Sequence, residues 1–143
     1  MDSVVSFGEW LRLQLTEAEL LDGDDYQLWP DLVPEWHISE ANKRAVVYTV
    51  SPLTNTTGQG GVTVLERHLV TVRIVDQTVD YYYLSDDAQK IDTAIHQKAG
   101  QLPIGGWSVL SCVKQSPYQD MAVRGDVEIR QLGGIFRVVM QRA

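Results

Sequence analysis

The stretch LVTVRIVDQTVDYYYLSDDAQKIDTAI (Leu69–Ile95) changes from the periodicity of a β-strand to that of an α-helix. Its first part alternates apolar with polar residues, which is the two-residue period of a half-buried strand. Its last part repeats apolar residues at three- and four-residue steps, as one face of a helix requires. These apolar residues are Val70, Val72 and Ile74 in the strand, and Ala88, Ile91 and Ile95 in the helix. The sequence therefore predicts a strand that leads into a helix packed against the sheet.

The joint between these two elements carries three consecutive tyrosines, Tyr81 to Tyr83, followed by two aspartates. Ser85 is a good N-cap, and Asp86 and Asp87 then fall in the first turn, where the helix dipole favours negative charge. Strand alternation sends Tyr82 to the face opposite its two neighbours, so the three phenols cannot form one platform. Capping and packing thus account for the joint without a catalytic site.

An N-terminal helix is predicted over residues Ser3 to Leu21. Its apolar residues recur at three- and four-residue steps: Val4, Phe7, Leu11, Leu15 and Ala18. Trp10 and Leu13 lie off this stripe. The helix is therefore expected to be covered on more than one side, by a sheet or by a neighbouring subunit.

The remaining segments predict further strands and loops. Residues Tyr26 to Lys43 read as irregular because they contain two prolines, with Trp29 and Trp36 expected to anchor the segment to the core. The polar, glycine-rich stretch Leu53 to Gly61 predicts a flexible hairpin loop. A break in the last strand is expected at Gly133-Gly134, as a bulge or tight turn. The predicted strands are Arg44 to Pro52, Val62 to Asp76, Trp107 to Pro117 and Val127 to Arg142.

The predicted order α-β-β-α-β-β indicates one α+β domain over residues 1–143. We expect a largely antiparallel sheet of four to five strands with two helices packed on one face. A chain of 143 residues, of which 44% are hydrophobic, can bury a core of its own. No internal repeat or domain boundary is evident.

Charge and cysteine content exclude several classes of function. The formal net charge of -7 argues against general affinity for nucleic-acid phosphates or anionic membranes. Cys112 is the single cysteine, so no intrachain disulfide can form, and a reducing cytosol suits the chain. The N-terminus lacks the positive region of a signal peptide, and no apolar run approaches the roughly 18 residues of a membrane span.

No motif in the chain has the residue types and spacing that a catalytic, cofactor or metal site requires. The acidic segment Asp22 to Asp25 has its glycine at the wrong position for an EF-hand calcium loop. His37, His68 and His96 are too far apart in sequence to form a helical metal pair. Gly58 to Gly61 lacks the lysine and helix of a phosphate loop, and Cys112 reads as a small buried residue. We therefore expect no enzyme activity and no cofactor.

Three sequence segments resemble those of a known family: LVTVRIVDQTVDYYYLSDDAQKIDTAI, GWSVLSCVKQSPY and IRQLGGIFRVVMQ. With the N-terminal helix and its tryptophan-proline exit, they resemble the tail terminator, or tail completion, proteins of long-tailed bacteriophages. The resemblance spans most of the chain. It implies a homo-oligomer, as a hexameric ring stacked on the last ring of the major tail tube protein and meeting the head-completion or connector proteins. Such a protein is made in the host bacterial cytoplasm and resides at the neck of the virion, where it ends tail polymerisation and provides the head-tail joining surface.

The resemblance also implies which surfaces are used. DNA would pass through the lumen without sequence-specific binding. A negatively charged lumen surface would not attract the DNA phosphates. The loop residues Thr54, Asn55, Thr56, Thr57 and Gln59 would dock on the tail tube. The sheet and first helix would supply two different subunit contacts, as a closed ring requires. The residues expected at these contacts are Trp10, Arg73, Tyr81 and Tyr83.

Two alternatives stay open at this point. The chain could be another neck or head-completion protein with a similar architecture. It could also be a small α+β enzyme or ligand-binding domain with a pocket between sheet and helix. The polar groups of that pocket would be Tyr81, Tyr83, His68 and Asp86.

Overall fold

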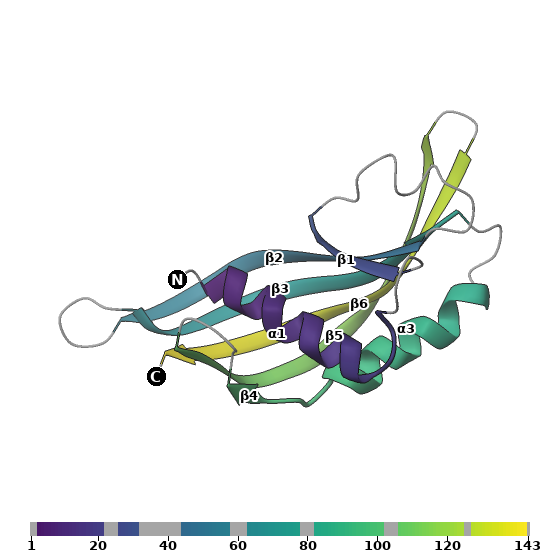
Figure 1. Ribbon diagram of the computed structural model, residues 1–143. Coiled ribbons are helices and arrows are strands. Elements are labelled where there is room, and N and C mark those ends of the chain that lie inside the picture. The colour runs from purple at the N-terminus through teal and green to yellow at the C-terminus, as the bar shows by residue number, and fades with distance from the viewer. Residues whose placement is uncertain are drawn as a thin grey trace.

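The computed structural model describes residues 3–21, 26–31, 44–57, 63–77, 82–101, 106–124 and 127–142. These residues form an α+β fold with two helices, α1 (Ser3–Glu17) and α3 (Tyr82–Ile95), as Figure 1 shows. The six strands are β1 (Tyr26–Pro30), β2 (Arg44–Thr57), β3 (Thr63–Asp76), β4 (Gly100–Gln101), β5 (Trp107–Arg124) and β6 (Val127–Arg142). The α+β class is thus confirmed.

The strands form one mixed sheet in the order β1-β2-β3-β6-β5-β4. All neighbouring strands are antiparallel except β1, which runs parallel to β2. The predicted element order is wrong because it lacks β1 and the two-residue β4. Prolines made Tyr26–Pro30 look irregular, but Pro30 is the last residue of an edge strand, where a missing N–H costs little. Residues 32–43, with Trp36, lie outside the described ranges.

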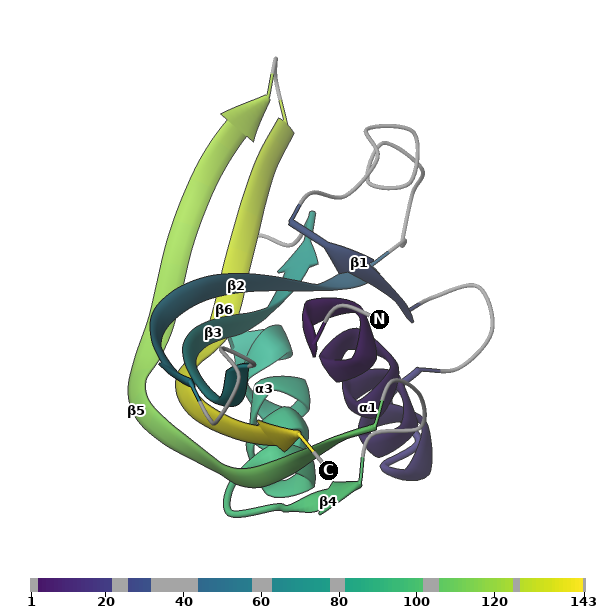
Figure 2. The same ribbon diagram turned by 90° about the vertical axis from the view of Figure 1, so that its left-hand side faces the viewer.

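The main core lies between the helices and one face of the sheet. Figure 2 shows α1 and α3 inside the curl that the sheet makes. Alternate residues of the long strands point towards them, as the period of two requires. The largest fully buried side chains of this core are Trp10, Phe7, Phe136, Leu11, Leu15, Ile74, Leu84, Ile91, Ile95, Met140 and Val46. Burial of Ile91 and Ile95 and of the three strand residues Val70, Val72 and Ile74 follows the predicted pattern.

A smaller cluster lies on the opposite face of the sheet, where neither helix packs. It consists of Ala45, Val47, Val75 and Ile129, with the half-buried Trp29 against it. Trp29 therefore contacts a core as expected, although from a strand and not from a loop. This cluster fastens β1 and the start of β6 to the middle of the sheet.

Strand β6 is continuous through Gly133 and Gly134, so the break predicted there is wrong. A Cβ atom at Gly133 would lie 2.0 Å from the carbonyl oxygen of Val72, which means that β3 and β6 approach each other too closely for a side chain. The register irregularities lie in the partner strand β5, between Val109 and Ser111 and between Lys114 and Ser116. Gly133 therefore allows the close approach of β3 and β6, and the register irregularities belong to β5.

Helix α3 begins at Tyr82, three residues before the predicted cap. Ser85 is therefore inside the helix, and Asp86 and Asp87 fall in its second turn. Leu84 explains the earlier start, because its side chain reaches the core with no exposed surface once this turn is helical. Asp87 lies 3.6 Å from Arg44 on β2 and 3.6 Å from Lys90, so its negative charge serves ion pairs and not a cap.

Two hairpins leave the body of the molecule at opposite ends (Figure 1). The β2–β3 pair continues to Thr57 and Thr63 at one end, and the β5–β6 pair to Arg124 and Val127 at the other. The loop predicted from Leu53 is therefore strand as far as Thr57. Within the described ranges, neither helix is long and apolar enough to cross a membrane.

Candidate functional site

The predicted tail-docking residues lie at the end of the β2–β3 hairpin. Thr54, Asn55, Thr56 and Thr57 are in β2 and pair with β3, so their assignment to a loop is wrong. Threonine favours the pleated conformation of a strand, which explains why this polar segment extends the hairpin. Leu53 sits at a register irregularity between Pro52 and Thr54 and is 43% exposed. Gln59 lies outside the described residues.

The residues predicted at subunit contacts separate in the fold. Trp10 is only 2% exposed and packs beside Phe7, with ring centroids 5.6 Å apart. Its side chain has no surface to offer to a neighbouring subunit, because the sheet covers the second side of α1 from within the same chain. Tyr83 is in the first turn of α3, and its side chain, like all of Tyr81, lies outside the described part of the chain.

Arg73 joins several elements on the face of the sheet away from the helices. Its guanidinium donates hydrogen bonds to Gln131 Oε1 on β6 at 2.7 Å, to Thr49 Oγ1 on β2 at 3.2 Å and to the backbone oxygen of Asp31 at 3.2 Å. It also lies 5.8 Å from the ring centroid of Tyr118 on β5. Burial lowers the pKa of Arg73 from its ordinary value, and the nearby Tyr118 and acidic residues offset part of this shift. The guanidinium thus binds β6, β2 and the backbone of Asp31 within the chain.

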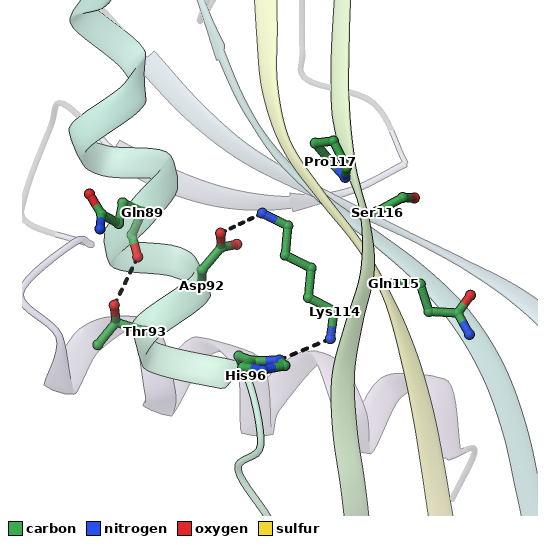
Figure 3. Close-up of a pocket in the computed structure, with 8 residues that line it drawn as sticks. All are labelled: Gln89, Asp92, Thr93, His96, Lys114, Gln115, Ser116 and Pro117. Atoms are coloured by element: carbon green, nitrogen blue, oxygen red, sulfur yellow. Dashed lines mark hydrogen bonds and ion pairs between the residues drawn. The ribbon is translucent and has the colours of Figure 1, made fainter.

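A hollow of about 500 Å³ lies between α3 and β5 (Figure 3). At its centre the ammonium of Lys114 on β5 contacts Asp92 Oδ2 on α3 at 2.5 Å. His96, just after α3, accepts a hydrogen bond on Nδ1 from the backbone N–H of Lys114 at 3.0 Å. The other lining residues are Gln89, Thr93, Gln115, Ser116 and Pro117.

These bonds attach the end of α3 to the outer edge of β5. The N–H of Gln97 adds a third bond, to the carbonyl oxygen of Cys112 at 2.7 Å. Because His96 Nδ1 accepts a hydrogen bond, the neutral ring must carry its proton on Nε2. The edge of a sheet offers unpaired backbone groups, and here a helix end and an imidazole satisfy them. The hollow is therefore a structural joint with polar walls, and its Lys114 charge is already neutralised by Asp92.

Sequence reasoning missed this joint. Asp92 and His96 are four residues apart, which places them on one side of a helix, and that spacing was a usable signal. Lys114 is the first charged residue of β5, which was a second signal. Their contact could not be predicted, because it depends on which strand edge receives the end of α3.

Of the polar groups proposed for an alternative ligand pocket, the structure describes His68 and Asp86, and these two lie apart. His68 is 3% exposed on β3, and its Nε2 lies 2.8 Å from Glu66 Oε2. Asp86 lines a different hollow, of about 590 Å³, with residues of α3 and the end of α1. His68 and Asp86 therefore do not line a common cavity.

Among the described residues, no group of three or more His, Cys, Asp or Glu side chains lies close enough to hold a metal ion. The thiol of Cys112 is fully buried, and burial raises its pKa to about 12. A neutral, enclosed thiol does not act as a nucleophile. No protein-family model and no curated protein matches the chain.

Proposed function

We propose that the chain is a structural protein of phage assembly, a tail terminator that forms a ring at the head-proximal end of the tail tube. Its partners are further copies of itself, the major tail tube protein and the head-completion or connector proteins, and DNA passes through its lumen. It resides in the tail-neck region of the virion after synthesis in the host cytoplasm. The resemblance of the three sequence segments is the starting point for this proposal.

The observation that carries the proposal is the pair of hairpins at opposite ends of the sheet. A terminator ring needs one surface for the tube and another, on its far side, for the head. Two hairpins that extend in opposite directions from one rigid sheet suit this task. Hairpin ends are also a usual place for binding residues, since the scaffold positions them while they remain accessible.

The acidic composition supports the same role. A net charge of -7 at pH 7 disfavours adhesion to DNA that slides through a channel. The polar β2–β3 hairpin, with the threonines that were predicted to dock, is the end that we assign to the tail tube. The β5–β6 end is then assigned to the head-completion protein.

Two matched hairpin deletions test this assignment. In the first, residues 57–64 are replaced by Asn-Gly, which joins the paired residues Thr56 and Leu65 by a two-residue turn. In the second, residues 123–128 are replaced by Asn-Gly between the paired residues Ala122 and Ile129. Both variants keep the core strands, so both should retain the parent's circular dichroism spectrum and cooperative melting.

The variant shortened at β2–β3 should fail to co-sediment with purified tail tubes, whereas the variant shortened at β5–β6 should bind tubes but not join them to heads. If the variant shortened at β5–β6 fails to bind tubes and the other variant binds them, the β5–β6 end must be assigned to the tail tube and the β2–β3 end to the head. Binding of the full chain to connectors but never to tubes would identify another neck protein. A full chain that stays monomeric and binds neither tubes nor connectors would refute the proposed function.

A further inference from the structure

Arg137 stands in the middle of an aliphatic patch on the sheet face away from the helices. It lies between Phe136 and Val138, which are both 0% exposed and face the helices, so its own side chain points to the other face. Leu69 and Val113 are its partners on the two neighbouring strands. The aliphatic residues around Arg137 on this face, which we call the Arg137 patch, are Leu69, Val113, Ile135 and Val139.

The Arg137 patch is accessible to a partner. Arg137 is exposed, Val113 is 40% exposed, and the other three aliphatic residues are partly exposed. The structure records no ion pair or hydrogen bond for Arg137 within the described part of the chain. Arginine surrounded by apolar surface is typical of the residues that contribute most to protein interfaces. A partner for this patch must bring apolar side chains on both sides of a carboxylate.

The outer side of α1 carries this arrangement. Val5 and Leu13 are 52% and 47% exposed, although the predicted apolar stripe of the helix faces inwards. Glu9 lies midway between them, with 48% of its side chain exposed. Residues four apart follow one ridge of a helix, so the sequence of this ridge is aliphatic, acidic, aliphatic. Arg12 lies 3.9 Å from Glu9, and such an exposed pair contributes little that would oppose a new partner.

The dimensions of the two surfaces agree. Val5 and Leu13 are eight residues apart on a helix, which corresponds to about 12 Å. Ile135 and Val139 are four residues apart on a strand, which corresponds to about 13 Å. Glu9 occupies the midpoint of the first pair, and Arg137 occupies the midpoint of the second.

We propose that α1 of one copy packs along β6 of a second copy, with Glu9 paired to Arg137 and the aliphatic residues of both surfaces in contact. The ridge is on the exposed side of α1, and the patch is on the sheet face away from the helices, so the two cannot meet within one chain. Figure 2 shows α1 on the inner side of the curled sheet. The contact is therefore heterologous, and repetition of it produces a closed ring when the rotation closes. This inference rests on the proposed function, which requires copies to join head to tail.

Charge exchange between the two surfaces tests the contact. Glu9→Arg and Arg137→Glu should each weaken self-association, measured by sedimentation velocity, by at least about tenfold, because each leaves two like charges facing each other. The double variant restores an opposite-charge pair and should return to within about threefold of the parent. Asp86→Arg and Arg142→Glu make the same charge changes outside the two surfaces and should associate like the parent.

A disulfide provides an independent readout. A chain with Glu9→Cys and Arg137→Cys should form a ladder of linked oligomers under oxidising conditions, whereas a mixture of the two single variants should stop at dimers. The buried Cys112 does not interfere.

The outcomes separate this inference from the proposed function. Rings that form without a ladder, and that neither charge reversal weakens, would overturn the contact and leave the proposed function intact. If a charge-reversal variant has a lowered melting temperature by circular dichroism, the disulfide experiment decides in its place. Absence of a ladder in that experiment also counts against the contact. Linked Glu9→Cys dimers without Arg137→Cys would indicate a two-fold contact and also overturn the inference.

Discussion

Of the two glycines of β6, Gly133 should be the more sensitive to substitution by alanine. The new Cβ would lie 2.0 Å from Val72 O and 2.6 Å from the Cα of Arg73. Both contacts are to the backbone of the neighbouring strand, so no side-chain rotation relieves them. The strands β3 and β6 would have to separate at the centre of the sheet, where twelve consecutive residue pairs lie in register.

The expected cost follows from overpacking. Forcing an extra carbon into a packed interior costs about 1–3 kcal/mol, and a backbone clash belongs at the upper end, so we expect a loss of about 3 kcal/mol. Alanine would otherwise stabilise by about 0.4–1 kcal/mol through the unfolded chain, which makes the sign of the effect diagnostic. With a slope of about 2 kcal/mol per molar urea, the unfolding midpoint should fall by about 1.5 M.

Two further glycines provide controls for this measurement. At Gly134 the nearest atoms are Lys114 Cε at 2.9 Å and the buried Phe136 ring at 3.1 Å. The lysine end can rotate away and the ring needs only a slight shift, so Gly134→Ala should lose about 1 kcal/mol, less than Gly133→Ala. At Gly100 the nearest atom is Trp10 Nε1 at 3.5 Å, an ordinary contact, and Gly100→Ala should be close to neutral. A midpoint for Gly133→Ala at or above that of Gly134→Ala would refute the reasoning.

Two more predictions concern single side chains. Arg73→Lys should lower the free energy of unfolding by about 1–2 kcal/mol in the same urea assay, because one ammonium cannot reproduce the guanidinium's bonds to Gln131, Thr49 and Asp31; an unchanged midpoint would contradict this. Cys112, whose pKa is raised to about 12, should remain unlabelled by iodoacetamide at pH 8 in native protein and react once urea unfolds the chain. Mass spectrometry would detect either product, and rapid native labelling would show that the thiol is accessible.

The strand-to-helix stretch Leu69–Ile95 was predictable because its two periodicities are separate and strong. Val70, Val72 and Ile74 face the helices, and Ile91 and Ile95 face the sheet, as their spacing indicated. Boundaries were less predictable. The helix starts at Tyr82 because Leu84 gains burial there, and this gain depends on the sheet beneath it.

In two segments, local composition predicted a loop where the structure has a strand. The threonines of residues 54–57 look like loop residues, but a partner strand alongside makes them extend β2. Prolines suggested an irregular segment at residues 26–30, but the parallel pairing with β2 places Pro30 at a strand end on the sheet edge. In both places the neighbour across the sheet decides the conformation, and that neighbour is distant in sequence.

The candidate surfaces depended still more on tertiary structure. Trp10 and Leu13 both lie off the helical stripe, and both were expected to be covered by a sheet or by a neighbouring subunit. Trp10 is buried within the chain, whereas Leu13 is 47% exposed. The difference arises because the fold covers the side of α1 that carries Trp10 and leaves the side that carries Leu13 uncovered. The Lys114–Asp92 joint and the surroundings of Arg137 likewise combine residues from separate strands and helices.

The sequence by itself determined the α+β class, the helical and strand periods and the inward-facing apolar residues of α1, β3 and α3, because these follow from side-chain spacing within single segments. It also determined the acidic charge and the absence of a recognisable catalytic motif in its residues. Only the tertiary structure decided the strand order, the close approach at Gly133 and the two hairpins at opposite ends. It alone decided which apolar residues stay exposed, because burial depends on contacts between segments that sequence spacing does not encode.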